Sequence, residues 1–519
     1  SIGGSITLSN AIVTASGATG ILAKGGLTIN SGTITANGNI GIKADGCDLT
    51  IKGGKVTATG TSGNGIYANG GNVVISGGEV EAKGTQYGIY AYPGSVSMTD
   101  ATVTAEAQLY FGIDAQGGSM TAENCTITAT CSGTSGYGIR STGGNTTLTN
   151  CKVTATGGYA GIYTENNSNN IVITGGEVEA YNTNLSDTYH SYGGIAATSG
   201  SVSVTGATIT AGGNYSVYAK SGIVFDSSTF TLSSVCTTIN GDFIIRNNSN
   251  LTSSASGAYS LDNENGSISI SDSKVEAKRQ IYGVGGITLT NNAIVNIDSD
   301  ANPAIHAVNN GITIDGSTVT TISNIFAVHG DLIIRNHSKV KVTGVDYYSL
   351  YSYDNVSISD SEVEFTNEIH SDQKNVTING SVVRATGNGS GQIYAVYGNI
   401  TLGWSNPSDL IYAKSYRTSD GSVTIAAGKT FIDECGNTYS GTMDKVNDAY
   451  AINGKTLRPY SSNSDVSNSL LVLADNANNT AVINTFNGQT YNVTLVGRTL
   501  YKDGAWNTLC LPFSLTEEQ

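Results

Sequence analysis

Apolar and polar residues alternate in short segments along the first four hundred positions, as in 27–36 (LTINSGTITA). Alternation of period two predicts β-strands, with Leu27, Ile29, Ile34 and Ala36 inside and the intervening Thr residues in water. Two residues separate successive strands, and they include Asn, Asp or Gly, which tolerate a left-handed backbone. These predicted corner residues are Asn10, Asp100, Asn124, Asn150, Asp272 and Asp360, with Gly53, Gly77, Gly175 and Gly206 in other repeats.

A second motif, an apolar anchor that often follows Gly, recurs about every 23 residues. Repeats of this length, each with three short strands, cannot bury their apolar side chains alone and therefore stack as coils. Intervals between anchors vary from 19 to 33 residues, whereas left-handed β-helices usually repeat in multiples of six. The sequence predicts an all-β, right-handed parallel β-helix of about 17 coils. The anchors are Ile21, Ile42, Ile66, Ile89, Ile113, Ile139, Ile162, Ile195, Val217, Ile239, Leu261, Ile281, Ile305, Ile325, Leu350, Ile369 and Ile393.

The repeat pattern changes twice towards the C-terminus. Residues 1–402 are predicted to form the β-helix, and residues 403–455 are predicted to be strands that close its open end, where unpaired backbone would recruit other chains. Residues 456–519 predict a small β-rich region that begins a further domain, with strands at 470–473 and 491–495. The widest interval between anchors contains the insertion 181–192 (YNTNLSDTYHSY), which we expect to project as a loop.

Composition and charge narrow the fold class and the kinds of partner that the protein can bind. The 519 residues include 66 Gly and only 13% charged residues, a mixture that favours strands and tight turns over helices. A net charge of -15 opposes binding to nucleic acid and to anionic membranes, and no apolar run is long enough to span a bilayer. We therefore expect no nucleic-acid partner, no membrane insertion in this chain and a monomeric protein.

Seven cysteines without a CxxC pair make a disulfide framework or a zinc site a poor explanation. Cys125 and Cys151 fall at the same repeat position one coil apart, where other coils carry Gly or Ala. This position is interpreted as a slot for small core residues. A disulfide between the two coils remains the alternative, since the expected coil spacing permits it.

Two segments carry a family resemblance: the coil 53–60 (GGKVTATG) and the segment 506–513 (WNTLCLPF). Together they resemble uncharacterised Bacteroidetes extracellular and surface proteins with a pectate-lyase-like right-handed parallel β-helix, which are adhesin-like or carbohydrate-binding. The resemblance implies a secreted or cell-surface protein of the bacterial envelope and a polysaccharide partner. It supplies no catalytic or binding residue that can be carried over to this chain.

The sequence contains no recognisable catalytic set. Neither the Gly-His-Gly nor the Arg-x-Lys tripeptide of polygalacturonase-like enzymes is present. Glycoside hydrolysis needs two carboxylates that face one bond. The paired carboxylates in this chain alternate with core Val residues and are expected to face solvent on separate coils. These pairs are Glu79 with Glu81, Glu177 with Glu179 and Glu362 with Glu364.

Cofactor sites are equally sparse, and no cofactor is predicted, although calcium stays possible. Oxygen ligands for calcium are available at Asp45 with Asp48, or at Asp298, Asp300 and Asn302, but a polar turn is the preferred interpretation, because Pro303 and Asn309 stand where a calcium-binding EF-hand loop needs Gly and Glu. The five histidines are scattered, and no two share one repeat position on adjacent coils; they are interpreted as surface residues. They are His190, His306, His329, His337 and His370.

Tyrosine gives the most specific signal, with 28 Tyr against 9 Phe and 2 Trp. Aromatic residues repeatedly occupy the position after the anchor or two positions before it, so the coils should align them in a ladder. The ladder either stabilises the sheet or forms a platform for sugar rings. The candidate carbohydrate-binding residues are Tyr67, Tyr87, Tyr90, Phe111, Tyr137, Tyr163 and Tyr218.

The leading prediction is a non-catalytic, adhesin-like surface protein that binds an extended polysaccharide or glycan along the β-helix. A flat, repeated surface suits a polymer better than a small molecule, which would favour a concave pocket. Two alternatives stay open: a polysaccharide lyase or glycoside hydrolase with an unrecognised site, and a passive spacer for a C-terminal domain.

Overall fold

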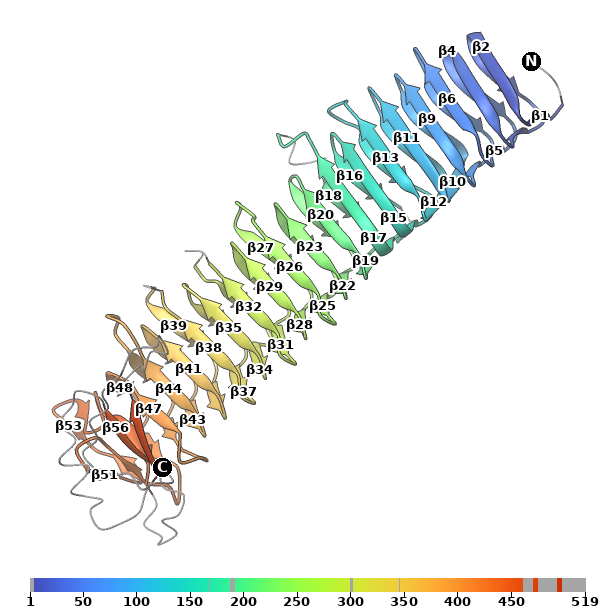
Figure 1. Ribbon diagram of the computed structural model, residues 1–519. Helices are drawn as coiled ribbons and strands as arrows, with labels where there is room; N and C mark the ends of the chain where they lie inside the picture. The colour runs from blue at the N-terminus through green and yellow to red at the C-terminus, as the bar shows by residue number, and fades with distance from the viewer. Residues whose placement is uncertain are drawn as a thin grey trace, which may run out of the picture.

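The structure is a computed structural model that describes residues 4–166, 168–186, 192–298, 302–344 and 346–460, together with the backbone of 470–474 and 492–496. All of its regular elements are β-strands, and the coils stack in chain order into a rod (Figure 1). Every pairing between successive coils up to β49 (Val423–Ile425) is parallel and in register or nearly so. The chain is a right-handed parallel β-helix of about 18 turns, which confirms the predicted fold class.

Each coil contributes one strand to each of three parallel sheets, here called sheets 1, 2 and 3 in chain order within a coil. Six strands bend around a corner and belong to two sheets. They are β2 (Ala11–Ala23) and β4 (Gly32–Asp45) in sheets 2 and 3, β10 (Tyr87–Thr99) and β12 (Phe111–Glu123) in sheets 3 and 1, and β15 (Thr146–Gly157) and β17 (Ile171–Asn182) in sheets 1 and 2.

The remaining strands each belong to one sheet. Sheet 1 adds β1 (Ile6–Leu8), β3 (Leu27–Ile29), β5 (Leu49–Ile51), β8 (Val73–Ile75), β19 (Val202–Thr205), β22 (Ile223–Asp226), β25 (Phe243–Arg246), β28 (Ile268–Ser271), β31 (Ile287–Thr290), β34 (Ile312–Asp315), β37 (Leu332–Arg335), β40 (Val356–Ser359), β43 (Val376–Asn379), β46 (Ile400–Leu402) and β49 (Val423–Ile425).

Sheet 2 adds β6 (Lys55–Gly60), β9 (Gly78–Gly84), β11 (Ala101–Ala107), β13 (Thr126–Cys131), β20 (Thr208–Gly212), β23 (Thr229–Leu232), β26 (Asn250–Ser253), β29 (Lys274–Ala277), β32 (Ile294–Ile297), β35 (Thr318–Thr321), β38 (Lys339–Val342), β41 (Glu362–Phe365), β44 (Val382–Ala385) and β47 (Leu410–Tyr412).

Sheet 3 adds β7 (Asn64–Asn69), β14 (Tyr137–Ser141), β16 (Ala160–Thr164), β18 (Gly193–Ala197), β21 (Tyr215–Ala219), β24 (Val235–Thr238), β27 (Tyr259–Asn263), β30 (Gln280–Gly283), β33 (Ile305–Ala307), β36 (Ile325–Ala327), β39 (Tyr348–Ser352), β42 (Glu368–Ser371), β45 (Gln392–Ala395) and β48 (Ser415–Thr418).

A continuous apolar core runs along the rod. Leu27, Ile29, Ile34 and Ala36 are all buried, as their alternation with Thr predicts, and equivalent residues of the next coils continue each column. Full burial of such aliphatic side chains contributes about 1.5–3 kcal/mol each, before the entropy of ordering the chain is subtracted. Because every coil buries its apolar residues against its neighbours, stability is collective.

The anchor prediction is correct except at one coil. Sheet 3 pairs Val217 with Cys236, and Cys236 in turn with Leu261, so Cys236 is the anchor of this coil. The predicted anchor Ile239 lies half-buried after the strand ends. Tyr416 pairs with Ile393 and anchors a further coil, so the parallel stack extends beyond residue 402.

The corners between sheets 1 and 2 adopt the left-handed backbone that the sequence predicts, with one exception. The φ angle is 52° at Asn10 and 45° at Asp360, and the other predicted corners except Gly53 also have positive φ. At that corner the left-handed residue is Gly54, with φ of 89°. A Cβ added to Gly54 would lie 2.5 Å from the carbonyl oxygen of Gly32 on the preceding coil, so this position also needs a small residue.

The same column explains Cys125 and Cys151. Both thiols are buried and free, which confirms the small-residue slot and not the disulfide. The backbone N–H of Cys125 donates to Cys151 Sγ at 3.4 Å. In later coils Ser replaces Cys, and the N–H of Ser228 donates to Ser249 Oγ at 3.2 Å in the same way. The slot therefore satisfies backbone donors that would otherwise be buried without a partner.

Antiparallel strands follow the last coils. Here β55 (Thr456–Pro459) pairs antiparallel with β47, and β52 (Thr442–Met443) pairs antiparallel with β49. Four short strands complete this region. β50 (Phe431–Ile432) pairs with β55 and with β51 (Thr438–Tyr439), and β53 (Lys445–Val446) forms a hairpin with β54 (Ala449–Tyr450). Farther on, β56 (Leu470–Ala474) and β57 (Asn492–Val496) pair in parallel near the two predicted strands. The segment 506–513 lies outside the described residues.

None of the described residues forms a helix that is long and apolar enough to span a bilayer.

Candidate functional site

The aromatic ladder lies on the outer surface of sheet 3. Tyr90 pairs in register with Tyr67 of the preceding coil, and Tyr87 pairs with Phe111 of the following one. The rings of Tyr87 and Tyr90 are 4.1 Å apart and nearly parallel, so the position before the anchor and the position after it form one surface. Seven candidate residues were predicted from the sequence, and six of them, from Tyr67 to Tyr163, contact one another in an unbroken chain of rings.

Much of this ladder is internal packing. The Tyr163 side chain is 4% exposed and Phe111 8%, so neither offers a ring face to a ligand. Tyr163 forms a small apolar cluster with two alanines, and Tyr192, at the end of the predicted insertion, packs on its ring at 5.4 Å. Tyr192 also contacts Tyr218, the seventh candidate, at 5.8 Å. Residues 187–191 of the insertion lie outside the described residues.

Two exposed rings flank the ladder, and the sequence prediction missed both. Tyr92, three positions after its anchor, is 44% exposed and lies parallel to Tyr90 with ring centroids 6.0 Å apart. Tyr110, three positions before the anchor of the next coil, is 45% exposed and contacts Tyr87 at 5.5 Å. Extending the search to three positions before and three positions after the anchor would have found them.

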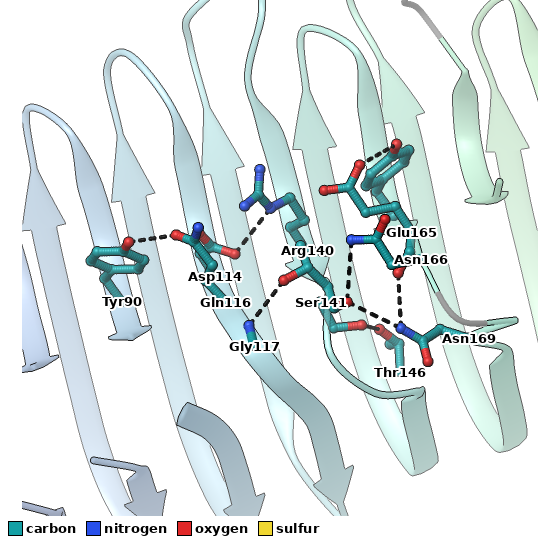
Figure 2. A network of polar contacts seen from close by, with 12 residues as sticks. Tyr90, Asp114, Gln116, Gly117, Arg140, Ser141, Thr146, Glu165, Asn166 and Asn169 are labelled. Carbon is teal, nitrogen blue, oxygen red and sulfur yellow. Dashed lines mark hydrogen bonds and ion pairs between the residues drawn. The ribbon is translucent and has the colours of Figure 1, made fainter. Parts of the chain in front are cut away.

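A row of polar side chains runs beside the ladder, three positions after the anchors. Phenol hydroxyls donate into this edge row: Tyr67 to Asn69, Tyr90 to Gln116 and Tyr163 to Glu165. The donation from Tyr90 crosses to the next coil, as Figure 2 shows. Together with Tyr92 and Thr142, these acceptors form the edge row Asn69, Tyr92, Gln116, Thr142 and Glu165.

An ion pair interrupts the tyrosine column between Tyr90 and Tyr163. Asp114 and Arg140 occupy the same position on adjacent coils, and Arg140 Nε donates to Asp114 Oδ1 at 3.1 Å (Figure 2). The guanidinium also lies over the Phe111 ring, 4.3 Å from its centroid. Arg140 Nε therefore already has its hydrogen-bond partner within the protein. In the part of the chain that the structure describes, the two terminal nitrogens of Arg140 have no hydrogen-bond partner.

Asp114 is the most perturbed carboxyl of this surface. Its side chain has no exposed surface, and Oδ2 has no hydrogen-bond partner among the described residues. Burial raises the pKa of Asp114 to about 7, because desolvation of the carboxylate outweighs the attraction of Arg140; the charge of Glu165 adds to the increase. The sequence pattern places Asp114 and Arg140 in one column, but it does not show that the carboxylate is covered.

The ladder continues in the C-terminal half, which the sequence prediction covered only in part. The position after the anchor carries His306, Phe326, Tyr351 and His370 on successive coils. His370 contradicts the interpretation of the histidines as surface residues. Its ring is 5% exposed and stacks on Tyr351 at 5.2 Å, with Nδ1 hydrogen-bonded to Glu368.

The paired carboxylates of sheet 2 face solvent, as predicted, and are matched by cations on neighbouring strands. Lys55 Nζ lies 2.7 Å from Glu79, and Lys152 Nζ lies 3.1 Å from Glu177. A groove of about 720 Å³ runs along the edge of this sheet, lined mainly by Thr, Gly and the Lys83–Glu106 ion pair. The charged groups that line this groove, Lys83 and Glu106, already neutralise one another. We therefore place the candidate site on sheet 3.

At the first candidate calcium position, one oxygen of each carboxylate already has protein partners. Asp45 accepts hydrogen bonds from Asn69 and Lys43, and Asp48 accepts two from Asn72. The second position includes residues 299–301, which lie outside the described part of the chain. No cluster of three or more potential metal ligands exists within the described residues.

No family model, curated protein or solved structure matches this chain. Function must therefore be argued from the site itself.

Proposed function

We propose that the protein is a non-catalytic, secreted or cell-surface β-helix that binds an extended polysaccharide across the outer surface of sheet 3. The observation that carries the proposal is the combination of two exposed tyrosine rings with a polar row: Tyr92 lies within the edge row, and Tyr110 lies at the opposite end of the sheet 3 strands. Sugars present apolar C–H faces and a rim of hydroxyl groups. A flat surface with aromatic rings and alternating donors and acceptors matches both features.

The polar groups that remain available are complementary to vicinal hydroxyls. Gln116 accepts a hydrogen bond from Tyr90 through Oε1, so its two Nε2 hydrogens are left as donors for a ligand. Arg140 keeps two terminal nitrogens as donors, and Glu165 keeps Oε1 as an acceptor after Tyr163 has bonded to Oε2. These groups come from three consecutive coils, so they repeat at about 4.8 Å along the axis. A polymer lying along this axis meets one such group per coil.

The inner rings contribute by fixing the outer ones. Tyr87, Tyr90 and Tyr92 lie on one bending strand, and the stacking of the first two holds the third against the sheet. Aromatic side chains lose little rotamer entropy on binding, and a ring that is already packed loses less. The packed inner rings therefore support the exposed rings that are proposed to contact the sugar.

Hydrolysis is the weaker alternative for the same surface. Asp114 and Glu165 lie two coils apart, about 10 Å, near the separation found in inverting glycosidases. A general acid has to reach the glycosidic oxygen, however, and Asp114 has no exposed surface behind Arg140 and Phe111. Glu165 alone does not make the two-carboxylate site.

The test is affinity electrophoresis of the full chain against hydroxyethylcellulose, xylan and polygalacturonate, with release of reducing and unsaturated ends measured in parallel. The double variant Tyr92→Ala/Tyr110→Ala is expected to weaken retention about tenfold or more, since it removes both exposed rings. Tyr181→Ala is the matched control, because Tyr181 lies on sheet 2. Retention unchanged in the double variant contradicts the location of the site, and no retention by any polymer contradicts binding altogether. Released sugar ends establish an enzyme instead.

A further inference from the structure

A second aromatic patch repeats the arrangement of the first near the other end of the rod. The coil anchored by Leu350 carries four tyrosines, at three and two positions before the anchor and at one and three positions after it: Tyr347, Tyr348, Tyr351 and Tyr353. Tyr347 is 75% exposed and Tyr353 is 38% exposed. These are the positions that Tyr110 and Tyr92 occupy relative to their own anchors.

The two patches share their supporting contacts. Tyr351 stacks on Phe326 of the preceding coil with centroids 4.1 Å apart, as Tyr90 stacks on Tyr67. Tyr347 packs against Tyr348 at 4.8 Å, so the exposed ring is again held by an inner one. We call Tyr347 and Tyr353, with their inner rings, the second patch, and Tyr92 and Tyr110, with theirs, the first patch.

The polar side chains correspond as well. Asp372 stands three positions after the anchor of the coil that follows Tyr353, which is the place of Gln116 relative to Tyr92. His370 lies between Glu368 at Nδ1 and Asp372, whose Oδ1 is 3.7 Å from Nε2. Each patch therefore combines exposed rings with carboxylate or amide oxygens on the next coil.

Both patches lie on one side of a continuous sheet. Register pairs connect sheet 3 without a break from β10 to β42, and Figure 1 shows the coils as one straight rod. Eleven coil steps separate the coil of Tyr92 from that of Tyr353, which amounts to about 50 Å at the spacing of parallel strands. An occupant of both patches has to be linear and at least that long.

We infer that the two patches are engaged together by a single extended polysaccharide chain, so that the protein selects long polymers over short fragments of the same sugar. This inference rests on the proposed function and specifies its substrate class. Once one patch has bound the polysaccharide, the second patch binds another segment of the same polysaccharide chain. The effective concentration of that segment at the second patch is set by the rigid separation of the two patches. Fragments shorter than this separation bind the two patches independently.

The experiment measures affinity and stoichiometry by calorimetry with size-fractionated fragments of whichever of the three polymers is retained. For fragments clearly shorter than about 50 Å, we expect two sites per protein of similar affinity. Above that length we expect one chain per protein and an affinity higher by about a hundredfold. A smooth dependence on length, with two sites throughout, overturns the inference.

Variants separate this inference from the proposed function. Tyr347→Ala/Tyr353→Ala removes the exposed rings of the second patch, and the expected result is one short-fragment site and loss of the advantage of long chains. Tyr92→Ala/Tyr110→Ala is expected to give the same loss from the other end. If only the first-patch variant changes binding, the proposed function stands and the inference fails. If neither polymer nor fragment binds the wild-type protein, both fail. Circular dichroism of each variant confirms that the coils remain folded.

Discussion

Asp114 gives a prediction with a defined sign and size. Its carboxyl is fully buried, and burial raises its pKa from the ordinary value of 3.8 to about 7. Between these two values the folded protein binds a proton at Asp114 that the unfolded chain does not. Stability of the surrounding coils therefore falls as the pH rises through this interval and is constant above it.

The size of this pH effect follows from the shift in the pKa of Asp114. One pKa unit corresponds to about 1.4 kcal/mol, so raising the pH from about 4.5 to about 8 should lower the local free energy of opening by about 3 kcal/mol. The variant Asp114→Asn cannot ionise. The altered contact with Arg140 changes the free energy of opening of this variant by the same amount at both pH values. The difference between the two pH values in the wild-type protein, less the same difference in Asp114→Asn, therefore reports the titration of Asp114.

Hydrogen exchange read by mass spectrometry is the suitable assay, because long repeat proteins need not unfold in one step. Protection factors are compared for peptides from the coils of Ile113 and Ile139 at the two pH values. The coil of Asp226 is an internal control: hydrogen bonding from Asn247 lowers the pKa of that carboxyl, so it stays ionised throughout this window. Equal protection at both pH values in the wild-type protein, or the same pH dependence in Asp114→Asn, refutes the reasoning.

Three further predictions concern the core and the thiols. Ile162→Ala leaves a cavity in a fully buried column and is expected to destabilise the surrounding coils by about 2–5 kcal/mol, measured by hydrogen exchange of peptides from these coils. Ser249→Ala leaves the buried N–H of Ser228 without its acceptor and should cost about 1–3 kcal/mol, visible as faster amide exchange at that position. Iodoacetamide should label the exposed Cys435 in the native protein and leave Cys236 unmodified, because Cys236 is buried and burial raises its pKa; mass spectrometry of tryptic peptides checks both.

The fold could be predicted because its information is local and repeated. A two-residue alternation sets which side chains face inward, and a repeat of about 23 residues sets which coil lies on which. The one misplaced anchor shows the limit of this logic. Ile239 is the larger apolar residue and fits the mean spacing, but the register from Val217 selects Cys236, which is small and fully buried. Cysteine behaves here as a small hydrophobic residue.

The candidate site could be predicted only as a column. Repetition places Tyr90, Asp114, Arg140 and Tyr163 at one position on successive coils, and opposite charges on neighbouring strands are expected to pair. Whether a side chain of this column is exposed to solvent depends on residues outside the repeat. Tyr163 is buried in part because Tyr192, at the end of an insertion, covers its ring.

The distinction between inner and outer rings follows from the strand ends. In the middle of a strand, outward side chains stand beside neighbours on both sides and on both adjacent coils, so an aromatic ring there is largely enclosed. At three positions from the anchor the strand reaches its corner, and a ring has neighbours on one side only. Tyr92, Tyr110, Tyr347 and Tyr353 all occupy such positions, and all are among the exposed aromatic residues. On a solenoid, therefore, aromatic residues at the strand ends are the ones to examine for binding, and those beside the anchor are the ones that hold them in place.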